Sequence, residues 1–423
     1  MNPARVSPAG LVGGLASLSM AAFLAGMTGR DGRWWEASVQ LAVLGGLLPL
    51  IYAVNHRIVP VFARRKWQRE SLWFVIIAAS LAGGVLSATG IRRSEGVLVQ
   101  AGALLSLSAG AGFVAQVGML LRQPVTTPAP PLPFEEQRSV DRTATRFSRL
   151  AAMYLLAGLS VGVAISFRVP DTGRWELVWA HLLLLGCVVS MATSVTYHVL
   201  PRWSTARWKT PRLVPVHVML SLLATPAMVV ALATDQSWLF RVGGPLQAIA
   251  LLLWGINCAP LLLPLPSATR MAWFMAFGFL AIGVSLGAAF ALREKFGPIY
   301  RQVHAEFNLF GWAGFMVLGA AYYLVPRFAG SAIPWPLLAR IQFPLLAIAI
   351  FVGGVFRRMQ NSGRGDYQIW IEATHLLMAL TLASFALQVA QTFRARPSAP
   401  VLLTPSRRRE KPPERPASLQ GFR

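Results

Sequence analysis

The sequence is 423 residues long, with 55% hydrophobic and only 13% charged residues and a mean hydropathy of +0.53. A soluble domain usually carries about 25% charged residues, so this composition excludes an ordinary soluble enzyme. The net charge of +23 is large enough for a nucleic-acid binder. However, the basic residues stand in short stretches between long apolar runs, as in membrane loops. We therefore expect contact with a lipid bilayer and no nucleic-acid partner.

The apolar runs predict an all-α integral membrane protein of about twelve transmembrane helices, because a spanning helix needs about 20 mostly apolar residues. The stretch 123–149 reads instead as a Pro-rich linker, and the basic, Pro-rich tail 394–423 is expected to be disordered. The predicted spans lie near residues 10–28, 38–55, 72–90, 97–121, 150–167, 175–200, 212–233, 242–263, 271–292, 300–325, 334–355 and 367–393.

The basic residues also predict an orientation. An even number of spans places both termini on one side of the membrane. The loops and termini of that side carry most of the 39 Lys and Arg residues. Since the richer side is the cytoplasmic one, we expect a bacterial inner-membrane protein with both termini and the 123–149 linker in the cytoplasm.

An internal repeat runs through the chain. Segments that begin at Gln40, His181 and Glu306 align, and they fall in the second, sixth and tenth predicted helices. This spacing predicts a unit of four helices that occurs three times, in residues 1–122, 150–264 and 265–393. Each segment has a glycine five residues after its start and a proline fifteen residues after that glycine: Gly45 and Pro60, Gly186 and Pro201, Gly311 and Pro326.

Polar side chains gather in the outer halves of the even-numbered helices. Burying such groups in a bilayer is costly, so each is a candidate for function. His304 and Glu306 are two residues apart and must face opposite sides of one helix. Glu372 and His375 share a helix face, with a spacing found in carboxylate metal sites and also in simple hydrogen-bonded pairs. The full set is Gln40, His181, His304, Glu306, Glu372 and His375.

The tenth predicted helix resembles a known family. The runs HAEFNLFGW from His304 and YYLVPR from Tyr322 resemble helix 10 of subunit I of the haem–copper oxidases. The nearest likeness is to the branch of C-type oxidases and nitric oxide reductases. A weaker likeness, WAH from Trp179 and YHVLPR from Tyr197, is to helix 6. The resemblance implies twelve helices in three pseudo-repeated four-helix arcs, with both termini inside.

The resemblance also implies a set of ligands. In that family helix 10 carries His-x-His, whose first histidine binds the active-site haem and whose second binds a low-spin haem. His304 matches the first position, whereas Glu306 replaces the second and Gln40 stands at the other low-spin position, on helix 2. His181 matches a copper ligand of helix 6, but the expected His-His pair of helix 7 is missing. The resemblance therefore implies one haem b on His304 and too few ligands for a copper site.

We therefore expect a relative of haem–copper oxidase subunit I that binds a single haem b and lacks full oxygen-reductase chemistry. Its role would be nitric oxide handling or a place beside other respiratory membrane subunits, as in the similar NnrS-type proteins. One alternative is a haem-free transporter or scaffold with a polar intramembrane cavity that includes Glu372 and His375. Another is a genuine terminal oxidase subunit with cytochrome-c oxidase activity, an oxidoreductase of the haem–copper type. No catalytic residue is predicted.

Overall fold

The computed structural model describes residues 6–29, 31–126, 128, 132–168, 172–293 and 297–395. Within these ranges, twelve helices are long and apolar enough to cross a membrane, which confirms the predicted all-α membrane protein. Most of the expected tail, 396–423, and part of the expected linker lie outside the described residues.

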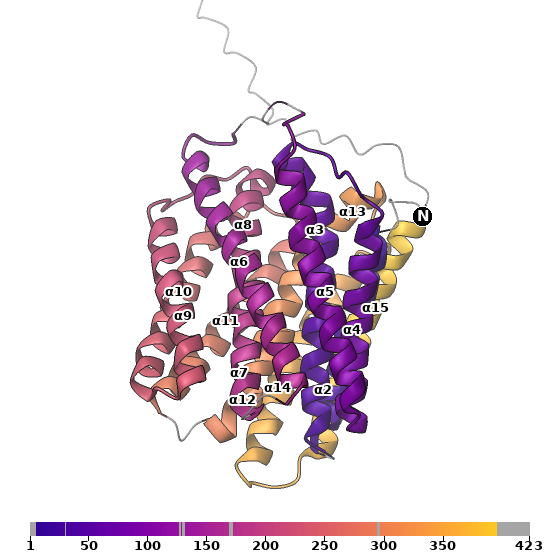
Figure 1. Cartoon of the computed structure of the whole chain (residues 1–423), viewed down its shortest axis with the longest axis vertical. Coiled ribbons are helices and arrows are strands. Elements are labelled where there is room, and N and C mark those ends of the chain that lie inside the picture. Colours follow the sequence, from indigo (N-terminus) through magenta and orange to yellow (C-terminus); the bar gives the residue numbers. More distant parts are fainter. Residues whose placement is uncertain are drawn as a thin grey trace, which may run out of the picture.

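The spanning helices form one upright bundle (Figure 1). Three of them consist of two α-helical parts joined by a π-helical segment: α2–η3–α3, α7–η4–α8 and α12–η6–α13. The elements are α1 (Val6–Gly26), η2 (Met27–Gly29), α2 (Arg33–Gln40), η3 (Leu41–Leu47), α3 (Leu48–Ala63), α4 (Leu72–Arg93), α5 (Gly96–Leu121), α6 (Gln137–Ser166), α7 (Thr172–His181), η4 (Leu182–Val189), α8 (Ser190–Ser204), α9 (Leu213–Thr234), α10 (Ser237–Leu262), α11 (Ser267–Leu292), α12 (Gly297–Glu306), η6 (Phe307–Ala313), α13 (Gly314–Ala329), α14 (Leu338–Asn361) and α15 (Gln368–Arg394).

The three divided helices form the centre of the bundle. In their most apolar stretches 67–78% of the residues are buried, against 22–50% in the other nine spans. The outer helices present apolar side chains to the lipid, as the exposed Met219, Leu223 and Ile256 show. We call the end of the bundle that holds the start of α1 and the end of α15 the terminal face. The helices α2, α7 and α12 lie at the opposite face (Figure 1).

The π-helical segments stand at corresponding places in the three central helices and contain Gly45, Gly186 and Gly311. A π-helical turn changes the hydrogen-bond pattern from i→i+4 to i→i+5 and often marks a functional site. In η3 the carbonyl of Leu44 accepts a hydrogen bond of 3.0 Å from Ser80 Oγ on α4. The hydropathy pattern did not predict these segments. The boundaries of the three predicted repeats stay a prediction.

Helix α6 begins at Gln137, well before the start at residue 150 that hydropathy predicts. Its first turns carry several charges, which lower their mean hydropathy. Val140, Ala144 and Phe147 nevertheless recur at helical spacing and are buried, because this part of α6 packs on α8. An amphipathic helix can extend beyond the bilayer in this way.

The first and last helices close the bundle. Helices α1 and α15 pack along their length, and small side chains let them approach. Ser19 Oγ donates to the Ala379 carbonyl at 2.8 Å, and Gln368 Nε2 donates to the Gly26 carbonyl at 2.8 Å. Helices α1 and α15 thus share one continuous interface.

The close packing at η3 can be tested with two glycines. A Cβ on Gly84 of α4 would collide with backbone atoms of Gly45, which cannot move aside as a flexible side chain can. We expect Gly84→Ala to lower stability by about 1–3 kcal/mol. In contrast, Gly118 on α5 has open space around its Cβ position, so Gly118→Ala should raise stability by up to about 1 kcal/mol. Thermal unfolding in detergent would measure both, and equal effects of the two variants would contradict this packing.

Candidate functional site

The three residues that align in the sequence repeat have the same place in the structure. Gln40, His181 and Glu306 end α2, α7 and α12, directly before the π-helical segments. They therefore occupy one level of the bundle, in the half nearer the opposite face. An amide, an imidazole and a carboxyl group stand at three equivalent positions. The three equivalent positions therefore differ in charge and in hydrogen-bonding capacity.

His304 lies on α12 and faces α11. Its Nδ1 is 2.8 Å from the Gly283 carbonyl oxygen. Since a carbonyl can only accept, Nδ1 carries the hydrogen of the neutral ring, and Nε2 keeps its lone pair. Gly287 makes room for the ring, because a Cβ there would lie 2.8 Å from His304 Cε1. Phe290 packs against the ring with its edge, at a centroid distance of 5.4 Å.

His181 is held in the same way. Its Nδ1 is 2.8 Å from the carbonyl oxygen of Leu177, one turn earlier on α7. The ring is half-buried, and its Nε2 also keeps a lone pair. Histidines that bind metals commonly donate their other ring hydrogen to a backbone carbonyl, which fixes the tautomer and the orientation of the ring.

Glu306 faces the other side of the tenth span from His304, as the two-residue spacing predicts. It is buried and forms an ion pair with Nε of Arg357 on α14. Its Oε1 also lies 3.0 Å from Nε2 of His375 on α15. Arg357 also connects α14 to α1, because its Nη2 donates to the Ala25 carbonyl at 3.0 Å. We call Glu306, Arg357 and His375 the buried triad.

The buried triad joins four spanning segments in the lipid-depth interior. All three side chains are at most 3% exposed. His375 Nδ1 bonds to the Ile371 carbonyl at 2.8 Å. Glu306 Oε2 has no hydrogen-bond partner among the residues that the structure describes. The carboxylate is thus held chiefly by the opposite charge of Arg357, since an unpaired charge here would be very costly.

Sequence reasoning missed Arg357. The predicted eleventh span ends at residue 355, so this arginine read as a loop charge, whereas α14 continues to Asn361. The available signal was Glu306 itself, because a carboxylate inside a bilayer requires a cationic partner at similar depth. Arg357 lies near the opposite face, where Glu306 also lies.

Glu372 and His375 do not converge on one point. Glu372 Oε1 accepts a hydrogen bond of 2.9 Å from Gln368, one turn earlier on α15, whereas His375 turns to Glu306. Gln40 is half-buried at the end of α2, and none of the side-chain hydrogen bonds found within the described ranges involves its amide group. Among those residues no three His, Cys, Asp or Glu side chains form a group that could hold a metal ion.

The other buried histidines lie in separate networks. His217 on α9 bonds to the Tyr197 hydroxyl at 2.8 Å. His56 on α3 bonds to Ser7 Oγ on α1 at 2.9 Å. Both contacts join neighbouring helices in the half of the bundle nearer the terminal face. They stabilise helix packing, away from His181 and His304.

Charged residues stand in the first turns of the central helices, at the opposite face. Glu36 is on α2, Glu176 is on α7 and Arg301 is on α12. At the start of α2, Arg33 donates to Asp31 at 2.8 Å. This hydrogen bond holds the pKa of Asp31 below its usual range. The first turns of the three central helices therefore carry charges of both signs.

The buried triad makes a prediction for stability. Arg357→Met leaves Glu306 buried without its counter-charge and should cost about 3–5 kcal/mol. Adding Glu306→Leu removes the unpaired charge, so the double variant should be more stable than Arg357→Met alone. Thermal unfolding of the single and double variants would measure this coupling. Additive losses would show that the two side chains do not depend on each other.

Comparison with known proteins agrees with the fold. No protein-family model matches the sequence, and a search of curated proteins finds no match. A solved cryo-EM structure of a haem–copper terminal oxidase dimer matches with a TM-score of 0.70 at 11% sequence identity. The match covers 94% of this chain and 85% of the oxidase chain. This multi-pass membrane protein therefore has the fold of haem–copper oxidase subunit I.

Proposed function

We propose that the chain binds one haem b through His304 and handles a small gas such as nitric oxide, without a second haem or a complete copper site. The observation that carries this proposal is the state of the His304 ring. Its Nδ1 hydrogen is donated to the Gly283 carbonyl, so Nε2 is left as the iron ligand. The carbonyl bond also raises the basicity of the ring.

The residues at the second haem position do not fit a haem. Two axial imidazoles would be needed, and the chain has Gln40 and Glu306 there. Glu306 is already paired with Arg357 and His375. The buried triad thus spans the interface between α12, α14 and α15, and its charges stabilise that interface. We infer that the chain has no internal electron-entry haem, so any electrons must come from another protein.

The residues near His181 do not fit a copper held by three imidazoles either. His181 offers one Nε2 lone pair, whereas His217 of α9 is bonded to Tyr197 in the half of the bundle nearer the terminal face. Neutral His181 can accept a hydrogen bond or hold a metal ion as a single ligand. The proposed role is therefore gas binding, and full oxygen reduction is not part of it.

A haem iron with one protein imidazole has a free axial position, at which small gases such as nitric oxide bind. The chain would contribute three things to such a site. The Gly283 carbonyl fixes the His304 tautomer, Gly287 provides the space for the ring, and Phe290 packs against the ring.

The test is spectroscopic. The protein, expressed with ample haem and purified in detergent, should show a single b-type band in reduced-minus-oxidised spectra, and carbon monoxide should shift it. His304→Gly should abolish the band, and free imidazole should restore it, because the small ligand can occupy the space that the side chain leaves. His198→Gln, at the other end of the bundle, is the matched control and should keep the band.

Three results would count against this function. Absence of haem after haem-replete expression would reject it. If, in addition, a bound metal or substrate depended on Glu372 and His375, the transporter alternative would be favoured. Two haems with stoichiometric copper would indicate a genuine terminal oxidase subunit. A band that survives in His304→Gly would show that another residue is the ligand.

A further inference from the structure

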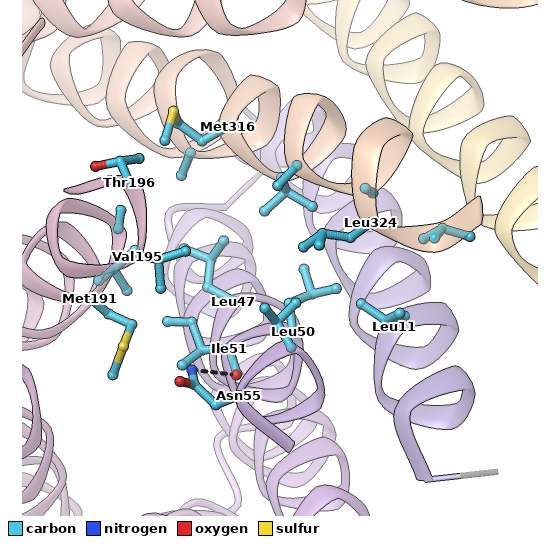
Figure 2. A pocket seen from close by; sticks show the side chains of 18 of the residues that line it. Leu11, Leu47, Leu50, Ile51, Asn55, Met191, Val195, Thr196, Met316 and Leu324 are labelled. Carbon is cyan, nitrogen blue, oxygen red and sulfur yellow. Dashed lines mark hydrogen bonds between the residues drawn. The ribbon is translucent and has the colours of Figure 1, made fainter. Parts of the chain in front are cut away.

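A cavity of about 130 Å³ lies between the central helices, in the half of the bundle nearer the terminal face. Most of its lining comes from α3, α8 and α13 (Figure 2). These three segments pack mainly on helices outside the centre, such as α1, α6 and α11. Single aromatic contacts, such as that of Trp203 with Tyr323, join them to one another. The central helices approach one another at η3 and η4, so the cavity is the space left where they separate.

The cavity wall is almost entirely hydrophobic. Apart from the indole N–H groups of its tryptophans, its polar side chains are Asn55 and Thr196, which use their hydrogens on the backbone of their own helices. Asn55 Nδ2 donates to the Ile51 carbonyl at 2.8 Å (Figure 2), and Thr196 Oγ1 donates to the Thr193 carbonyl at 2.9 Å. Apolar cavities of about this size stay dry and accept apolar molecules. Water is therefore a poor occupant, and a hydrocarbon group is a good one.

The dimensions suit a flexible chain. A water-sized group needs roughly 10–15 Å³ of such space, so the cavity of about 130 Å³ can hold about ten methylene-sized groups. Its lining extends from Trp312 in η6 to Phe328 in the last turn of α13. Sixteen residues of helix rise about 24 Å. An elongated alkyl chain matches this form better than a planar ring system does.

An aromatic stack leads from the cavity wall to a cation at the terminal face. Trp203, which lines the cavity, stacks on Tyr323 with a centroid distance of 4.1 Å. The guanidinium carbon of Arg327 lies over the Tyr323 ring, 3.5 Å from its centroid. Arg327 is exposed in the last turn of α13, next to the lining residue Phe328. None of the ion pairs found in the described part of the chain involves Arg327.

We propose that the cavity binds a single-chain amphiphile, with its alkyl chain between the central helices and its anionic head group on Arg327. A guanidinium recognises carboxylate and phosphate through paired hydrogen bonds. The stacking on Tyr323 fixes the plane of that guanidinium. A fatty acid and a lysophospholipid share this chemistry, and the two head groups can be distinguished by experiment.

Quenching of tryptophan fluorescence tests the binding site for the alkyl chain, because Trp203, Trp273 and Trp312 line the cavity. The probe is stearic acid brominated in mid-chain, added to the full-length protein in nanodiscs. We expect a saturable quenching component in addition to the linear quenching of tryptophans that face the lipid. Ala320→Phe, or the smaller change Ala320→Leu, should remove the saturable component by filling the cavity. Leu223→Phe on the exposed face of α9 should not affect it.

The head-group site is tested with Arg327→Gln, which changes an exposed side chain and should not impair folding. We expect about tenfold weaker binding of the brominated acid, as for loss of a charge-assisted hydrogen bond. Binding of its methyl ester, which has no charge, should be the same in both proteins. Competition with unlabelled stearate and with lysophosphatidylglycerol then shows which anionic head group is preferred.

The proposal is overturned if quenching rises only linearly with probe, or if the folded Ala320 variants keep the saturable component. Equal affinity of the acid and its methyl ester for the wild-type protein would overturn the role of Arg327. These measurements do not involve haem. Failure of the haem proposal would therefore leave them unchanged, and the two proposals can fail separately.

Discussion

The structure depends on one constraint: polar groups within the lipid-depth interior must find their partners inside the protein. Twelve helices satisfy most backbone groups by themselves. The same constraint explains the side-chain contacts. Ser80 bonds to a carbonyl in η3, His181 and His304 bond to carbonyls of α7 and α11, and Arg357 bonds to a carbonyl of α1. Polar side chains here thus serve mainly to hold helices together and to fix ring orientations.

The level at which the central helices become π-helical organises the candidate site. Gln40, His181 and Glu306 precede the three π segments, and their surroundings differ. Glu306 is enclosed by opposite charge in the buried triad, whereas His181 and His304 keep one ring nitrogen free of backbone contacts. One frame can therefore carry an ion pair at one of these positions and histidines with an available ring nitrogen at another. The fold is compatible with both arrangements, because the backbone makes its hydrogen bonds within the helices and does not need these side chains for them.

The sequence predicted the features that hydropathy and local steric effects determine. Long apolar runs predicted the twelve spans. The spacing of Gly45 and Pro60 led us to predict that the second helix is one of three related segments. The π segments could not be predicted, because a change from i→i+4 to i→i+5 bonding leaves the hydrophobic pattern almost unaltered. The partner of Glu306 was missed for a different reason. Arg357 lies beyond the apolar run, and only the three-dimensional packing of α14 on α12 brings it to the carboxylate.

The contact between α1 and α15 has a consequence for biosynthesis. Helix α1 is made long before α15, although the two pack along their length. Until α15 is made, the Gly26 carbonyl lacks the donor that Gln368 supplies. The Ala25 carbonyl, in contrast, accepts from Thr28 of the same segment before Arg357 of α14 is made. A chain truncated before α15 would therefore expose the surface of α1 that α15 covers in the bundle.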